Sequence, residues 1–249
     1  MKNEVVVYWA NNYFNYEALE PDYAIKDLHS RVEKINELDK YETKNLIKCP
    51  VATLYLKNTF RVKSPIDYSI CWDKKNGVVN TEHYDQNFFN KFINVRDVKS
   101  GIISMKFGSN VFFTEEDNLI IEYKSACYAE NTLANNINII HGEINIGQYF
   151  RYSDFACFIN RPGEFLNVKR GEALYYVRFL TDKKVVLKKF NCTPEMRLLV
   201  EPIMETKHRT RVRIKNTNVW GKMEEYYNVF KMSQIKSLLV KKIKENILE

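Results

Sequence analysis

Three side chains in the sequence have the types and spacing of a mononuclear metal site. His83 and Asp85 are separated by one residue, and His141 lies further along the chain. Two imidazoles and one carboxylate on one side of a metal leave three coordination positions open, an arrangement that suits ferrous iron and dioxygen chemistry. The sequence therefore offers His83, Asp85 and His141 as candidate metal ligands.

A fourth residue extends this pattern to a co-substrate. Arg151 follows His141 and carries the planar guanidinium that binds a carboxylate through two parallel hydrogen bonds. An HxD pair, a distant histidine and a later arginine resemble the arrangement in Fe(II)/2-oxoglutarate-dependent oxygenases. This resemblance implies a double-stranded β-helix in which His83, Asp85 and His141 bind Fe(II) and Arg151 binds 2-oxoglutarate.

The same residues also have a structural interpretation. An HxD pair is short enough to arise by chance, and the segment between Asp85 and His141 lacks the Gly-Gly pair that the oxygenase resemblance leads us to expect. In this interpretation His83 and Asp85 form a turn contact, and His141 is a loop residue before Gly142. A further metal hypothesis, a cupin-like half-site at His141-Gly142-Glu143, is weaker because no other histidines cluster there.

Motifs of other catalytic classes are missing from the sequence. It has no GxSxG nucleophile motif, and its eight glycines form no GxGxxG or GxxxxGK[ST] phosphate loop. Nucleotide hydrolysis by a P-loop is thereby excluded. The five cysteines form no CxxC pair and have no recognisable catalytic context, so we expect small buried thiols in a reducing compartment.

A basic segment near the C-terminus is a second candidate site. Arg209, Arg211, Arg213 and Lys215 occupy alternate positions, so an extended strand would carry all four on one face. Together with the net charge of +7, this pattern favours attraction to a polyanion such as nucleic acid, with binding that weakens as salt increases. The alternative is a solvated edge strand whose charges prevent unwanted pairing.

Alternation of apolar and polar residues dominates 137–190 and predicts successive strands. Turn residues separate the alternating runs at 161–163, 170–171 and 181–183. Proline fixes φ and glycine permits positive φ, so the chain can reverse at such points without strain. We therefore expect an antiparallel meander in this stretch.

Further patterns predict strands before this meander and helices at its periphery. Asn76-Gly77 is typical of a type I′ hairpin turn. A helix with one apolar stripe is expected at about 22–46, and a helical segment at 222–248 is expected to pack on its own domain or on a partner. The other expected strands lie at 5–9, 49–62, 66–72, 102–113 and 118–128.

These patterns together predict a mainly β protein. We expect an antiparallel jelly-roll or β-sandwich-like domain at 1–205, followed by a basic strand and a C-terminal helical extension at 206–249. The 249 residues, 45% of them hydrophobic, are enough to bury a large core. The N-terminus does not resemble a signal peptide and no stretch approaches the roughly 20 apolar residues of a membrane span, so we expect a cytoplasmic protein with no membrane partner.

Several phrases resemble uncharacterised proteins encoded by tailed bacteriophages, particularly those of marine hosts. The phrases are the opening VVVYWA and residues 49–70, 142–151 and 169–187. The resemblance implies no activity and transfers no functional residue. It implies a place in the host cytoplasm or on the virion, with phage or host proteins as partners, and it counts against His141 as an indispensable ligand.

The sequence as a whole therefore favours a phage-encoded β-rich binding or structural module. This hypothesis requires no cofactor, is compatible with a homo-oligomer, and places the contact surfaces on the meander loops and the basic C-terminal part. One alternative is the Fe(II)/2-oxoglutarate-dependent oxygenase described above. The other is a nucleic-acid-associated protein that acts through the basic residues between 209 and 215.

Overall fold

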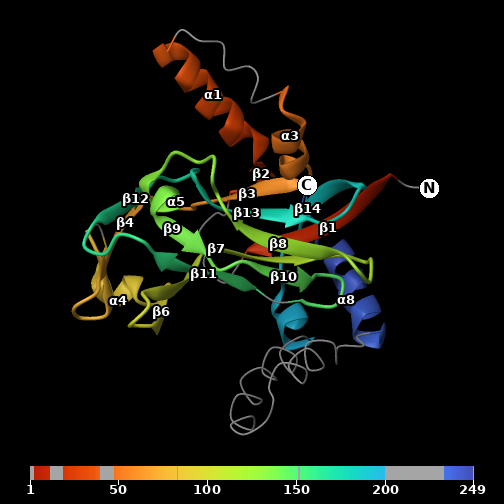
Figure 1. Cartoon of the computed structure of the whole chain (residues 1–249). Helices are drawn as coiled ribbons and strands as arrows, with labels where there is room; N and C mark the ends of the chain where they lie inside the picture. The colour runs from red at the N-terminus through yellow and green to blue at the C-terminus, as the bar shows by residue number, and fades with distance from the viewer. Residues whose placement is uncertain are drawn as a thin grey trace, which may run out of the picture.

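The computed structural model describes residues 3–11, 19–39, 48–82, 84–150, 152–199 and 233–248. In this part of the chain the protein is mainly β, as predicted. Its strands form three sheets, and its helices lie at the periphery of these sheets (Figure 1).

The first sheet brings the N-terminal strand together with strands from later in the chain. Its strand order is β14-β1-β7-β11-β9, with β6 also paired to β7. β14 runs parallel to β1, whereas the other pairings in this sheet are antiparallel. The strands are β1 (Glu4–Asn11), β6 (Ile93–Asp97), β7 (Ile102–Phe113), β9 (Ile137–Ile139), β11 (Ser153–Ile159) and β14 (Lys184–Lys189).

The second and third sheets are antiparallel. The second has the order β10-β8-β13-β3-β2 and the third has the order β12-β4-β5. The second sheet consists of β2 (Asp22–Tyr23), β3 (Thr59–Lys63), β8 (Ile120–Ser125), β10 (Gly142–Asn145) and β13 (Ala173–Phe179). The third consists of β4 (Tyr68–Asp73), β5 (Val78–Thr81) and β12 (Phe165–Val168).

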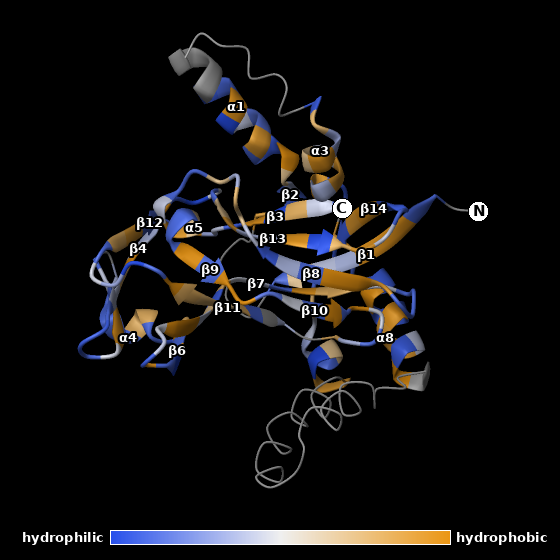
Figure 2. Ribbon diagram, in the orientation of Figure 1, coloured by the Kyte–Doolittle hydropathy of each residue, from blue (hydrophilic) through white to orange (hydrophobic). Residues whose placement is uncertain are grey.

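One apolar core joins the inner faces of all three sheets. Trp9 of the first sheet, Tyr175 of the second and Trp72 of the third belong to the same buried cluster. Figure 2 shows the apolar residues concentrated on the strands and the polar residues gathered in many of the connections. Burial of aromatic and β-branched side chains on one face of each strand therefore holds the sheets together.

Five helices with defined bounds surround the sheets in the described part of the chain, and two of them add Phe89 and Leu133 to this core. They are α1 (Ile25–Asp39), α3 (Pro50–Leu56), α4 (Gln86–Phe89), α5 (Thr132–Asn136) and α8 (Ser233–Glu245). Leu28 and Val32 of α1 pack with Leu56 of α3 and Tyr176 of β13 in a second buried cluster. None of the helices in the described part of the chain has the length and apolar character needed to cross a membrane.

The C-terminal helix α8 packs on its own domain. Leu239 and Ile243 are fully buried against Tyr8, Phe113 and Phe190 on the outer face of the first sheet. Of the two options that the sequence left open for this helix, packing on the same chain is therefore the one observed. The predicted domain boundary at residue 205 lies outside the described residues and stays a prediction.

The predicted strand at 49–62 is correct only in its second half. Residues 59–63 form β3, but the segment before them is the helix α3. Pro50 is favoured at the first turn of a helix, and Ala52 and Leu56 are both buried at a spacing of four residues. The apparent alternation at Val51, Thr53 and Tyr55 was misleading because the local sequence satisfied both periodicities.

The predicted meander at 137–190 is wrong, although two of its turns occur. Gly163 and Gly171 have φ values of 83° and 89°, so the chain does reverse there. However, β11, β12, β13 and β14 do not pair with one another. Each pairs with a strand from an earlier part of the chain, and successive strands enter different sheets.

The β4–β5 hairpin is confirmed, but its turn is not type I′. Gly77 has a φ of 65° and its N–H donates to the Asp73 carbonyl at 2.8 Å. The Asp73 carboxylate accepts from the N–H groups of Lys75 and Asn76 at 2.9 and 3.1 Å. Asn76 does not have the positive φ that a type I′ turn requires, and the Asp73 side chain closes a longer turn.

Candidate functional site

The described residues of the predicted iron site have structural partners. Asp85 caps α4, because its Oδ2 accepts from the Phe88 N–H at 3.0 Å. His141 lies in the connection between β9 and β10, where its Nδ1 donates to the Tyr123 carbonyl at 3.0 Å. His83 and Arg151 lie outside the described residues, so the complete iron and 2-oxoglutarate site stays a prediction.

Within the described ranges, no group of three or more His, Cys, Asp or Glu side chains is placed to hold a metal ion. The cysteines are free thiols, and Cys71, Cys157 and Cys192 are buried as predicted. Cys127 is exposed, which the sequence did not indicate. The basic residues Arg209, Arg211, Arg213 and Lys215 fall outside the described chain, so the polyanion site is also still a prediction.

The structure instead reveals a groove of about 520 Å³ between the first and second sheets. We call it the β2–β14 groove, because the edge strands β2 and β14 form its sides. Eleven residues line it: Glu20, Pro21, Asp22, Tyr23, Lys26, Phe60, Lys63, Lys184, Val185, Val186 and Leu187.

The floor of the β2–β14 groove is continuous with the apolar core. Phe60 and Val185 belong to the core cluster, and Leu187 packs against it. The Tyr23 ring covers Phe60 at a centroid distance of 4.7 Å but remains 44% exposed. The groove is therefore a place where two packed sheets diverge and leave apolar surface accessible from outside.

One side of the groove is the backbone edge of β14. The Lys184 N–H donates to the Asn3 carbonyl at 2.9 Å, and the Phe190 N–H donates to the Trp9 carbonyl at 3.0 Å. Even-numbered residues of β14 thus direct their backbone groups toward β1. In a parallel ladder the intervening residues direct theirs the opposite way, toward the outer edge.

This outer edge of β14 is closed at both ends. At one end the Val185 N–H donates to Asn58 Oδ1 at 3.3 Å. At the other end the Lys189 carbonyl accepts from the Leu248 N–H at 2.8 Å. Between these points Leu187, which lines the groove, directs its backbone N–H and carbonyl outward.

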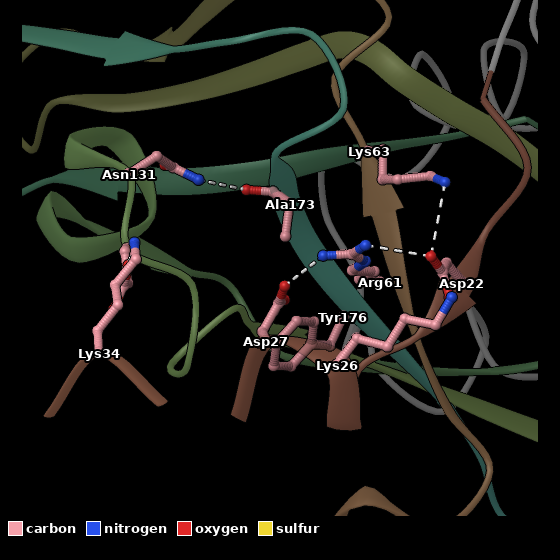
Figure 3. A network of polar contacts seen from close by, with 10 residues as sticks. Asp22, Lys26, Asp27, Lys34, Arg61, Lys63, Asn131, Ala173 and Tyr176 are labelled. Carbon is pink, nitrogen blue, oxygen red and sulfur yellow. Dashed lines mark hydrogen bonds and ion pairs between the residues drawn. The ribbon is translucent and has the colours of Figure 1, made fainter. Parts of the chain in front are cut away.

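A network of charged side chains lies next to the rim of the groove (Figure 3). Arg61 lies between two carboxylates: its Nη1 donates to Asp27 Oδ1 at 2.5 Å and its Nη2 donates to Asp22 Oδ2 at 3.1 Å. The Tyr176 hydroxyl donates to the other oxygen of Asp27 at 2.9 Å. Sheet register explains this grouping, because Arg61 is opposite Asp22 on one side and Tyr176 on the other.

Contacts within this network shift the pKa values of Asp22 and Tyr176. Burial of Asp22 opposes ionisation, but hydrogen bonds from Lys26 and Arg61 outweigh it and lower the pKa of the Asp22 carboxyl. Burial raises the pKa of the Tyr176 hydroxyl, and the Asp27 carboxylate raises it further. Asp22 is therefore held as a carboxylate, and Tyr176 stays neutral.

Lysine side chains give the rim of the groove a basic character. Lys26 and Lys63 lie 2.9 and 3.8 Å from the Asp22 carboxylate. Lys184 pairs with Glu4 at 2.9 Å and is largely exposed. The rim thus combines three ammonium groups with the carboxylates of Glu20 and Asp22 above an apolar floor.

Asn58 fixes the end of the groove at which the two sheets meet. It has a φ of 51°, which is unfavourable for a residue with a Cβ atom. Its Nδ2 donates to the carbonyls of Thr181 and Lys183, both at 2.8 Å, while its Oδ1 accepts from Val185.

We expect Asn58→Gly to lower the free energy of unfolding by about 1–3 kcal/mol, because buried backbone groups lose their partners while positive φ is still accommodated. Asn58→Ala should cost roughly 1 kcal/mol more, because alanine also resists positive φ. Denaturant unfolding of both variants measures the two effects separately. Equal stability of wild type and Asn58→Gly would show that the side chain does not hold this junction.

The sequence did not predict the groove, although it contained one signal for it. Residues 184–189 read KVVLKK, and lysines that flank a short apolar strand are typical of a protected sheet edge. The contribution of β2, Tyr23 and Phe60 had no local signal, because those residues reach the groove only through sheet packing. Comparison with known proteins gave no match, neither to a protein-family model nor to a curated protein sequence.

Proposed function

We propose that this protein is a phage-encoded, β-rich binding module of β-sandwich type, and that the β2–β14 groove is its ligand site. The observation that carries the proposal is the hollow whose accessible apolar surface comes from Tyr23, Val186 and Leu187, beside the outward-directed backbone of Leu187. The phage origin, a jelly-roll form of the sandwich and a place in the host cytoplasm or on the virion belong to the same hypothesis.

The groove has the properties of a preformed binding site. Ligand sites are usually concave and mostly apolar, with a few polar groups that orient the ligand. Phe60 and Val185 are only 4% and 2% exposed and are held by the core, so binding would not have to order them. The lysines at the rim and the backbone of Leu187 supply the polar groups.

Selection from a displayed library of random linear peptides tests this proposal. We expect the wild-type protein to enrich ligands whose binding is lost in Val186→Arg, because Val186 is half-buried and lines the groove. The matched control is Phe165→Arg, which changes an exposed apolar residue on the edge strand of the third sheet. Enrichment of no peptide, or of peptides that bind Val186→Arg equally well, would contradict the proposal.

A further inference from the structure

The pairing of β14 with β1 shows which strand β14 accepts as a neighbour. The register places Glu4 beside Lys184, and their side chains meet at 2.9 Å. It then places the three valines of residues 5–7 beside residues 185–187. The preferred neighbour of β14 on this side is therefore an acidic residue followed by β-branched apolar residues.

The outer edge of β14 presents the same side chains. Side chains of a strand project above and below the sheet, so neighbours on either edge meet the same two faces. Val185 and Leu187 lie on the face that packs against the core. Alternation places Lys184, Val186 and Lys188 on the opposite face, where both lysines are exposed.

These charges argue against a second copy of this chain as the occupant. Two β14 strands paired edge to edge would bring Lys184 and Lys188 of one chain next to the same lysines of the other. Like charges in directly opposite positions destabilise a sheet. A strand with acidic residues at these positions would instead complement them.

We propose that the β2–β14 groove binds an extended polypeptide segment as an additional strand on the outer edge of β14. The recognised segment has about five residues, with apolar β-branched residues in the centre and an acidic residue at each end. Its backbone pairs with Leu187, its central apolar side chains cover Leu187 and Tyr23, and its acidic ends meet Lys184 and Lys188. This inference rests on the function proposed above.

The length follows from the two closed ends of the edge. The Val185 N–H donates to the Asn58 side chain, and the Leu248 N–H donates to the Lys189 carbonyl. The outward-directed groups between these two bonds are the Val185 carbonyl, both backbone groups of Leu187 and the Lys189 N–H, which span only a short stretch of strand. Such a stretch selects a linear motif within an extended segment rather than a whole folded surface.

Titration with labelled peptides tests the charge rule. Capped peptides that contain Glu-Val-Thr-Val-Glu or Lys-Val-Thr-Val-Lys are compared by fluorescence anisotropy. We expect the acidic peptide to bind wild type about tenfold more tightly, because two opposite-charge pairs replace two like-charge pairs. Equal affinity of the two peptides would overturn the inference.

A charge-swapped variant gives a sharper result. In Lys188→Glu the preferred peptide should carry one lysine, at the end that lies opposite position 188. Preference for Lys-Val-Thr-Val-Glu indicates antiparallel addition, and preference for Glu-Val-Thr-Val-Lys indicates parallel addition. Lys74→Glu, which changes an exposed lysine of the β4–β5 turn, is the control and should keep the wild-type preference.

Amide exchange distinguishes strand addition from other ways of filling the groove. Bound peptide should slow exchange of the Leu187 N–H, and N-methylation at alternate peptide amides should abolish binding. Unchanged exchange would overturn the inference, as would protection of Leu187 by a dimer without peptide. If the peptide library yields groove ligands that do not follow this motif, the proposed function stands and only this inference fails.

Discussion

Replacement of Arg61 by methionine is expected to lower the free energy of unfolding by about 3 kcal/mol. The Asp27 side chain is only 9% exposed and the Arg61 side chain 21%, so removal of the guanidinium leaves a carboxylate that water reaches poorly. Loss of one partner from a buried ion pair typically costs 3–5 kcal/mol, and the partial exposure of Arg61 favours the lower value. Equilibrium denaturation in urea measures the change.

The double variant Asp27→Asn/Arg61→Met should recover part of this loss. With both charges removed, no unpaired carboxylate remains beside Tyr176, and replacement of both partners is less costly than removal of one. A loss of stability in the double variant equal to the sum of the two single variants would show that the residues are not coupled.

An exposed ion pair supplies the control for this experiment. Arg161 lies 3.4 Å from Glu164, and their side chains are 62% and 56% exposed. Arg161→Met should change stability by less than about 1 kcal/mol, because solvent screens such a pair. If Arg61→Met is no more destabilising than Arg161→Met, the network does not hold β2, β3 and α1 together.

Truncation of the buried face of α8 is expected to destabilise the whole domain. Leu239 and Ile243 both have 0% exposure, and Leu239→Ala or Ile243→Ala should each cost about 2–5 kcal/mol through lost burial and the cavity left behind. The wide range reflects how far the surrounding side chains can close the cavity. The measurement is the midpoint and slope of denaturant unfolding.

The neighbouring residue of the same helix tests whether this effect comes from packing. Leu238 is 44% exposed, so Leu238→Ala changes the same residue type without opening a cavity and should cost less than about 1 kcal/mol. Similar losses for Leu238→Ala and Leu239→Ala would contradict the packing of α8 on the first sheet.

The packing of α8 on the first sheet also affects the β2–β14 groove. Immediately after the helix, Ile247 forms an isolated antiparallel β-bridge with Phe190. The Leu248 N–H donates to the Lys189 carbonyl at the outer edge of β14. The C-terminal residues therefore limit the length of edge that a ligand can use. Loosening α8 should lengthen the accessible edge as well as lower the stability of the domain.

Features that depend on adjacent residues could be predicted from the sequence. Consecutive β-branched and aromatic residues predicted β1, and Asn76-Gly77 predicted the β4–β5 hairpin. The apolar stripe at 22–46 predicted α1 within a few residues of its observed start. In each case neighbouring side chains decide the local conformation, so a short window of sequence contains the information.

Strand pairing and the candidate site were decided by the tertiary structure. Nothing near β14 indicates that it runs parallel to β1, which lies far earlier in the chain, because a strand pattern specifies two faces but no neighbour. In the same way, sheet register brings Asp22, Arg61 and Tyr176 together from three separate segments. The groove exists because the packed sheets diverge beside β14, and that divergence depends on how the whole core fills its volume, which no local pattern specifies.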